Sequence, residues 1–208
     1  MPAIVLRFET RFYQLASIRF LRNVRLMLWI ISGPSSVGKT TFIRNRRCVA
    51  LTGLPPETPI IKPVNAPGPD RRFQSVTDCF VHYNILRPVS LFAKRQAKKT
   101  SAIDEYRARS VRFADDPWWF GFAHEPADKK ALVLIANRAG ILERARNRSR
   151  YKFDYWKALY EKLRLSDIYR AWFAELNRTG IPHTFVDATN SGYAELDQDS
   201  ALAIVDAD

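Results

Sequence analysis

The segment from Gly33 to Thr41 has a spacing of residues suited to holding phosphate. It reads GPSSVGKTT, which is Gly, four residues, Gly, Lys and then Thr. The glycines allow backbone angles that side chains obstruct, so the N–H groups of the loop can converge on phosphate oxygens. Lys39 would then reach the β- and γ-phosphates, and the Thr40 hydroxyl would coordinate magnesium. The residues expected to contact ATP here are Gly33, Pro34, Ser35, Ser36, Val37, Gly38, Lys39, Thr40 and Thr41.

The residues on either side of this segment predict the elements that position it. RLMLWIIS, residues 25–32, is a short apolar run ending at glycine, which is typical of a buried strand. GKTTFIRNRR, residues 38–47, predicts the start of a helix, whose positive end would face the phosphates. Strand, glycine-rich loop and helix in this order are the context in which the pattern indicates a phosphate-binding loop.

The remainder of the chain alternates predicted strands with predicted helices. Strands are expected at 79–86, 130–136 and 183–189, with a short one at 59–62 inside a Pro- and Gly-rich stretch. Helices are expected at 91–112, 140–150 and 151–177, the last in two pieces with Ser166-Asp167 as a cap and Gly180 as the stop. This order predicts a three-layer αβα sandwich with a parallel sheet, whose ligands bind beyond the carboxyl ends of the strands.

The charge, the cysteines and the apolar runs of the sequence limit the kinds of partner and compartment that are expected. Thirty-three Lys and Arg against 21 Asp and Glu give a net charge of +12, which favours phosphates, nucleic acid or an acidic membrane surface. Cys48 and Cys79 lack metal-type spacing, which predicts a reducing compartment such as the cytoplasm. No apolar run is long enough to predict a membrane span. Residues 1–26 form a basic extension, either packed on the domain at 27–208 or a targeting segment.

The chain resembles the P-loop kinases, and the small nucleoside and nucleotide kinases in particular. GPSSVGKTT is similar to the phosphate loop of guanylate kinases. ALVLIANRAGILERARNRSRY, followed by YWKALYEKL and HTFVDATN, resembles the closing half of thymidylate-kinase-like proteins. The resemblance covers about residues 27–190, and only the phosphate loop in it is specific. It implies the P-loop nucleoside triphosphate hydrolase fold, with ATP and Mg²⁺ as cofactors and a small-molecule phosphoryl acceptor.

The resemblance also implies an arginine-bearing lid around residues 138–150. On a helix, Arg144 shares a face with Arg148, and Arg146 shares one with Arg150. Such a pair, Arg144 and Arg148 first, would neutralise charge as the phosphoryl group moves. The alternative is a solvated basic helix. In the loop after the last strand, the resemblance places Ala188 and Thr189 beside the adenine. The alternative is an ordinary strand-to-helix turn with Asp187 or Asn190 as its cap.

The second predicted strand, at 79–86, carries the candidates for the catalytic base and for binding the acceptor. Similar kinases place an Asp near its carboxyl end, where this chain has Asn84, and asparagine cannot act as a base. His82 lies on the same strand face and is the candidate base, or else a buried histidine. Arg87 is expected to hold the acceptor, as in similar kinases, or to lie on the surface. The guanylate-kinase stretch that binds the acceptor base is not reproduced in NAPGPDRRFQSV, although Arg71 there can still contact phosphate.

Residues 115–120 combine two acids with a run of aromatic side chains. Asp115 and Asp116 are expected to cap a turn, or alternatively to contact substrate or metal. Trp118, Trp119 and Phe120 are expected to pack in the core, or alternatively to stack on a ring of the substrate.

Three hypotheses of function follow from these residues. The leading one is an ATP-dependent kinase of a nucleotide, nucleoside, sugar or related metabolite. The alternatives are a P-loop NTPase coupled to nucleic acid or another macromolecule, which the charge of +12 favours, and a nucleotide-binding module without turnover, which Asn84 favours.

Overall fold

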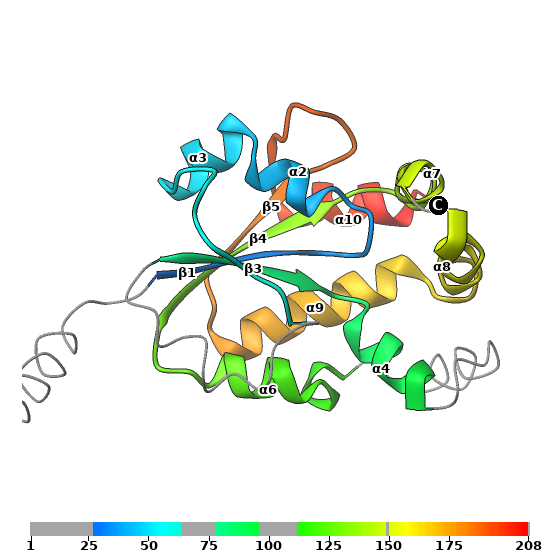
Figure 1. Cartoon of the computed structure of the whole chain (residues 1–208), viewed down its shortest axis with the longest axis horizontal. Helices are drawn as coiled ribbons and strands as arrows, with labels where there is room; N and C mark the ends of the chain where they lie inside the picture. Colours follow the sequence, from blue (N-terminus) through cyan, green and yellow to red (C-terminus); the bar gives the residue numbers. More distant parts are fainter. Residues whose placement is uncertain (1–26, 64–77, 96–111, 149, 208) are drawn as a thin grey trace, which may run out of the picture.

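A computed structural model describes residues 27–63, 78–95, 112–148 and 150–207 of the chain. A six-stranded sheet runs through this part, with helices packed against both of its faces (Figure 1). The expected extension at 1–26, the candidate Arg71 and most of the helix predicted over 91–112 lie outside the described residues. The α/β class and the layered arrangement predicted from the sequence are confirmed.

The sheet is ordered β2-β3-β1-β4-β5-β6. β1 (Met27–Gly33) lies at its centre, between β3 (Cys79–Asn84) and β4 (Asp128–Ile135), and is parallel to both. β2 (Ile60–Ile61) adds parallel to β3, and β5 (His183–Asp187) adds parallel to β4. Six consecutive residues of β1 are buried, because a central strand is covered on both faces.

The last strand departs from the predicted parallel sheet. β6 (Glu195–Leu196) pairs antiparallel with β5, so the expectation of a wholly parallel sheet is wrong. A parallel return needs a crossover of a dozen or more residues, whereas only a short turn joins these two strands. In that turn the Asn190 side chain accepts a hydrogen bond from the Gly192 N–H at 2.8 Å, and Tyr193 has a φ of 50°.

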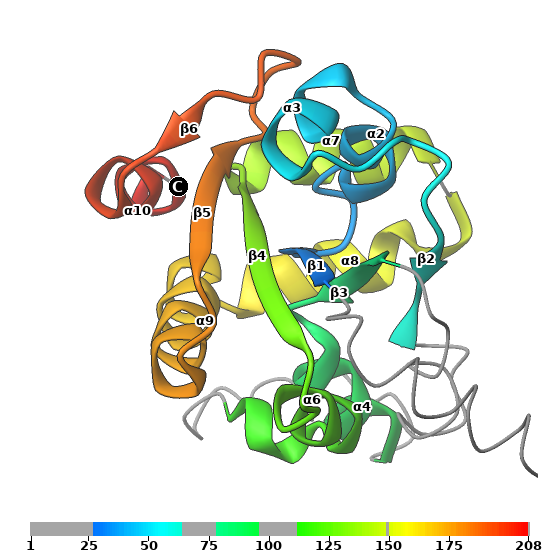
Figure 2. The same ribbon diagram turned by 90° about the vertical axis from the view of Figure 1, so that its left-hand side faces the viewer.

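Helices cover the two faces of the sheet unequally (Figures 1 and 2). One face bears α2 (Lys39–Ile43) and α3 (Arg46–Thr52), while the other bears α4 (Arg87–Arg95), α6 (Pro117–Ala123) and α9 (Leu165–Thr179). α7 (Arg138–Arg148) and α8 (Arg150–Lys162) lie toward the end of the sheet where β1 finishes. α10 (Gln198–Asp206) packs beside β5 and α9, and a 3-10 turn spans Phe113–Asp115.

Local sequence explains where several helices begin and end. α2 stops after five residues, because the Asn45 side chain caps a new helix by accepting from the Arg47 N–H. Asp116 caps α6 in the same way, as expected. The predicted cap of α9 at Ser166-Asp167 is wrong: the helix already includes buried Leu165, so both residues lie inside its first turn. Gly180 ends α9 with a φ of 66°, as predicted.

The core on the α9 side of the sheet is aromatic. The rings of Tyr83 and Trp172 lie 5.0 Å apart between centroids, and those of Trp119 and Trp172 lie 4.6 Å apart. Trp118 and Trp119 are buried as expected, but Phe120 is 54% exposed. Helical spacing explains this correction, because Phe120 falls on the side of α6 opposite the core.

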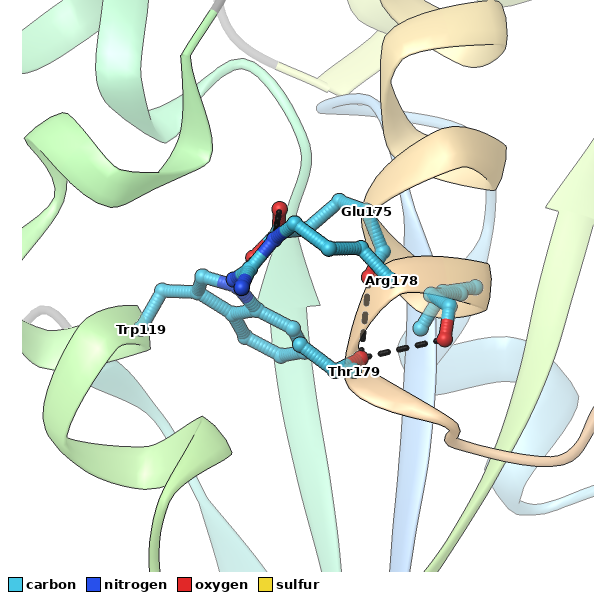
Figure 3. Close-up of polar contacts among 5 residues, drawn as sticks. Trp119, Glu175, Arg178 and Thr179 are labelled. Carbon is cyan, nitrogen blue, oxygen red and sulfur yellow. Dashed lines mark hydrogen bonds and ion pairs between the residues drawn. The ribbon is translucent and has the colours of Figure 1, made fainter.

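One buried carboxylate joins α6 to α9 (Figure 3). Trp119 Nε1 donates to Glu175 Oε1 at 2.7 Å, and the Arg178 guanidinium donates to both Glu175 oxygens. The hydroxyl of Thr179 donates to the Glu175 carbonyl at 2.9 Å. Burial alone would raise the pKa of Glu175, but the bonds from Arg178 and Trp119 outweigh it and lower that pKa. This network attaches the start of α6 to α9.

Candidate functional site

The loop between β1 and α2 has an unusual backbone. Gly33, Ser36 and Gly38 have φ values of 145°, 64° and 102°. A Cβ on Gly33 would lie 2.9 Å from the Val37 side chain and 3.0 Å from the Leu134 carbonyl oxygen, so only glycine fits there. Where residues of right- and left-handed conformation adjoin, the backbone can turn its N–H groups toward one side, and a concave backbone of that kind can bind an anion.

Lys39 lies inside this loop rather than on the surface. The residue is only 3% exposed, and its Nζ donates to the carbonyl oxygens of Gly33 at 2.8 Å and Pro34 at 2.6 Å. A buried lysine charge is costly unless it is held by hydrogen bonds. The loop therefore holds a positive charge at the carboxyl end of the central strand.

Thr40 follows in the first turn of α2, and its hydroxyl faces β3. The Thr40 Oγ1 lies 3.5 Å from His82 Nε2, and both residues are half-buried. The candidate base His82 is thus brought to the candidate metal ligand. Asn84 lies on the same strand face, two residues nearer the strand end, and its Oδ1 accepts from the Leu86 N–H at 3.1 Å. Asn84 therefore closes the turn into α4.

Arg87 lies at the start of α4 beside a buried acid that sequence reasoning did not pair with it. Its Nε is 2.8 Å from Asp116 Oδ2, and Asp116 is wholly buried. The Tyr83 hydroxyl donates to the same oxygen at 3.0 Å. Burial first, and then the Asp116 charge, raise the pKa of Tyr83 well above its usual value. The Arg87 side chain is 18% exposed, so it is mostly buried and only part of it is open to solvent.

Arg144 is the candidate lid arginine whose side chain touches the loop. Its Nη1 donates to the Val37 carbonyl and its Nη2 to the Ala188 carbonyl, both at 2.8 Å, while Nε donates to Gly140 at 3.1 Å. The guanidinium thus ties α7 to the phosphate loop and to the turn after β5. The side chain of its predicted partner, Arg148, lies outside the described part of the chain, as does that of Arg150.

Arg146 points differently from Arg144. Its guanidinium carbon lies 5.4 Å from the centroid of the Phe153 ring, which is a cation–π contact with α8. This cation is therefore held by the helix that follows α7.

The turn after β5 brings Ala188 and Thr189 to the same edge of the sheet as the loop. Ala188 is buried, and its N–H donates to Ile135 of β4 at 2.7 Å. Thr189 is exposed, and its N–H and hydroxyl both donate to Asp187 Oδ1. The alternative, an ordinary turn from the strand into a helix, is wrong, because this turn leads into the antiparallel strand β6. Through Arg144 the turn neighbours the loop.

Three aromatic side chains from α8 and α9 hold β1, β4 and the loop from the opposite side. The Tyr160 hydroxyl donates to the Ser35 carbonyl at 2.8 Å, and Tyr169 donates to Leu134 at 2.8 Å. Trp172 Nε1 donates to Ser32 Oγ at 3.0 Å. No local signal in the sequence indicated the polar partners of these side chains.

The topology places the phosphate loop and its neighbours at the end of the sheet where the parallel strands finish. The connection after β1 leads toward β3, whereas the connection after β4 leads toward β5, so the chain turns in opposite directions beside β1. Ligands of open α/β sheets bind beyond the carboxyl ends of the strands at such a point. Among the described residues, there is no group of three or more His, Cys, Asp or Glu side chains that could hold a metal ion.

Within the described ranges, no helix is both long and apolar enough to cross a membrane. A scan against protein-family models matches no family, and a search of curated proteins finds no match.

Proposed function

We propose that this chain is an ATP-dependent phosphotransferase that acts on a small-molecule acceptor. The observation that carries the proposal is Lys39, a 3% exposed cation whose Nζ lies among the carbonyls of a loop with positive φ at three positions. A backbone of this kind presents N–H groups to an anion, and the lysine adds a charge that fits the outer phosphates of a triphosphate. The P-loop fold assignment belongs to the same proposal.

The residues around the loop fit the remaining parts of the reaction. Thr40 offers a hydroxyl oxygen, which is a suitable ligand for a hard divalent ion that also binds phosphate oxygens. When bound, such an ion neutralises charge on the phosphates. Arg144 keeps the loop next to the turn that would contact the adenine at Ala188 and Thr189. Arg87 and Asn84, beside the end of β3, would orient the acceptor.

Positioning, more than proton removal, would drive the transfer. Phosphoryl transfer depends mainly on alignment and on charge stabilisation, so an enzyme of this kind needs no strong base. His82 is within reach of the Thr40 hydroxyl and so acts at the nucleotide side of the site. Arg148 remains a candidate for contacting the moving phosphoryl group.

The direct test measures nucleotide binding and then transfer. We expect the purified chain to bind ATP with a divalent ion, and a panel of nucleotides, nucleosides and sugars to include one that consumes ATP stoichiometrically. Lys39→Ala should abolish binding and transfer and leave the circular dichroism spectrum unchanged. A Lys39→Ala protein that turns over ATP as fast as the parent would overturn the proposal.

The same assay separates the alternatives. ATP hydrolysis that rises with DNA or RNA and falls steeply with salt would assign the chain to a nucleic-acid-coupled NTPase, which the net charge of +12 favours. ATP binding that depends on Lys39 but leads to no turnover with any addition would assign a binding module.

A further inference from the structure

Several carbonyl oxygens of the phosphate loop, residues 33–41, accept hydrogen bonds from the helix that follows it. Lys39 Nζ donates to those of Gly33 and Pro34. The Phe42 N–H donates to that of Gly38 at 2.9 Å, and both donors belong to α2. A carbonyl oxygen carries partial negative charge, so a loop that binds phosphate must turn these oxygens away from the ligand and its N–H groups toward it.

Two further carbonyls of the loop are held by side chains from helices far away in the sequence. Tyr160 of α8 donates its hydroxyl to the Ser35 carbonyl at 2.8 Å. Arg144 of α7 donates Nη1 to the Val37 carbonyl at the same distance. The peptide between Ser35 and Ser36 is trans, so its C=O and N–H point in opposite directions. The bond from Tyr160 therefore directs the Ser36 N–H away from α8, and no described residue accepts a hydrogen bond from that N–H.

The backbone conformation of Ser36 needs such support. Its φ of 64° lies in the left-handed region, which residues with a Cβ seldom adopt. Backbone of this kind persists only where the surrounding contacts determine it, and it gathers at ligand-binding sites. Tyr160 supplies one such contact from a position that is 1% exposed. Burial raises the pKa of its hydroxyl well above the usual value, so the hydroxyl keeps the proton that it donates.

We infer that Tyr160 is a positioning residue for the nucleotide, whose hydroxyl holds the peptide before Ser36 so that the Ser36 N–H faces the bound phosphates. The inference rests on the proposed function, because it needs phosphate in the loop. In this role Tyr160 touches neither the phosphates nor a metal ion, and it acts through the backbone alone. Because α8 directly follows the arginine-bearing α7, the hydroxyl also links this pair of helices to the affinity of the loop for phosphate.

Nuclear magnetic resonance of the unsubstituted protein gives the first test, which does not depend on any variant folding. The probe is inorganic tripolyphosphate with Mg²⁺, added to the full chain labelled with ¹⁵N. We expect the amide proton of Ser36 to move downfield and to exchange more slowly with solvent when the probe binds, because it then donates to a charged oxygen. A Ser36 amide that does not respond, while the amides of Gly38 and Lys39 do, would overturn the inference.

Tyr160→Phe, which removes one hydroxyl and keeps the ring, gives the second test. We expect it to weaken the binding of tripolyphosphate and of the β,γ-methylene analogue of ATP equally, by about tenfold in calorimetry, because both probes bind through phosphates. Tyr169→Phe is the matched control, since its buried hydroxyl donates at the same 2.8 Å to the carbonyl of Leu134 in β4, outside the loop. The control should lower the free energy of unfolding by a similar amount and keep the affinity for tripolyphosphate within about twofold.

The other results of this comparison contradict the inference. Loss of affinity for the ATP analogue alone would place Tyr160 at the base or the sugar, and equal losses in both variants would indicate a general loss of stability. Unchanged affinity in Tyr160→Phe also contradicts it, while binding of tripolyphosphate that depends on Lys39 leaves the proposed function intact. If neither probe binds the unsubstituted protein, the proposed function fails and the role of Tyr160 fails with it.

Discussion

Arg144 donates a hydrogen bond of 2.8 Å to the carbonyl oxygen of Val37, across a separation of 107 residues in the chain. The same guanidinium bonds to the carbonyl of Ala188, so one side chain links the first loop of the sheet to the last parallel strand. Two parallel donors held in a rigid fork are available to arginine and not to lysine. The loop conformation is therefore supported by a residue that lies far from it in sequence.

Replacing Arg144 with lysine should separate two roles for it. If it positions the loop, Arg144→Lys should weaken ATP binding about tenfold in calorimetry and leave the rate of transfer at saturating ATP nearly unchanged. If instead it contacts the transferring phosphoryl group, kcat should fall and ATP affinity should hold. Arg146→Lys serves as the matched control, because Arg146 contacts the Phe153 ring and not the loop.

Removing the charge of Asp116 should destabilise the fold. Asp116→Asn leaves Arg87 without its buried partner, and breaking such a pair costs about 3 to 5 kcal/mol when the remaining charge is fully buried. Because Arg87 keeps some exposure, we expect the lower end of that range or slightly less in urea unfolding. Exposed Asp115→Asn is the control and should change the free energy of unfolding by less than about 0.5 kcal/mol. Equal effects of the two substitutions would contradict the role of the pair.

Acid should unfold the protein partly through Glu175. Its pKa is lower in the folded chain than its ordinary value of 4.5, so the folded state binds fewer protons there than the unfolded state. The stability that Glu175 contributes is therefore complete above about pH 5 and is lost as pH falls through the folded pKa. We expect Glu175→Gln to flatten the fall in the free energy of unfolding between about pH 5 and pH 3. Exposed Glu161→Gln should leave the slope as it is.

Both cysteine thiols should be slow to react in the native protein. Cys48 and Cys79 are buried, and burial raises the pKa of each to about 11. At pH 8 this leaves about 200-fold less thiolate than an ordinary cysteine has. Ellman's reagent should therefore titrate both thiols quickly in guanidinium chloride and scarcely at all without it. Rapid native labelling of either thiol would contradict this placement.

Much of the fold was predictable because its signals are local. The strands at β1, β3, β4 and β5 are apolar runs bounded by turn residues, and Gly180 ends α9 through a conformation that glycine adopts easily. The antiparallel β6 was missed because two residues carry no periodicity. Phe120 was misplaced because an unbroken aromatic run does not show which of its members faces outward.

The candidate site was predictable in its loop and less so around it. The spacing of Gly33, Gly38 and Lys39 fixes a local backbone, so the sequence was sufficient there. The partners of Arg87, Thr40 and Tyr160 come from distant segments, and pairing them requires the register of β3 on β1 and the packing of α6 and α8. The strand register decides that His82, rather than Asn84, meets Thr40.

The central position of β1 has a consequence for how the protein opens. A strand paired on both sides loses its hydrogen bonds only when both neighbours separate, whereas the edge strands β2 and β6 have one partner each. Local opening spreads from the least stable units, so amide protons of β1 should exchange with solvent late and those of β2 and β6 early. The strand that leads into Gly33 therefore belongs to the slowest-exchanging unit of the sheet. Either edge strand, β2 or β6, can open locally while the loop after β1 keeps its conformation.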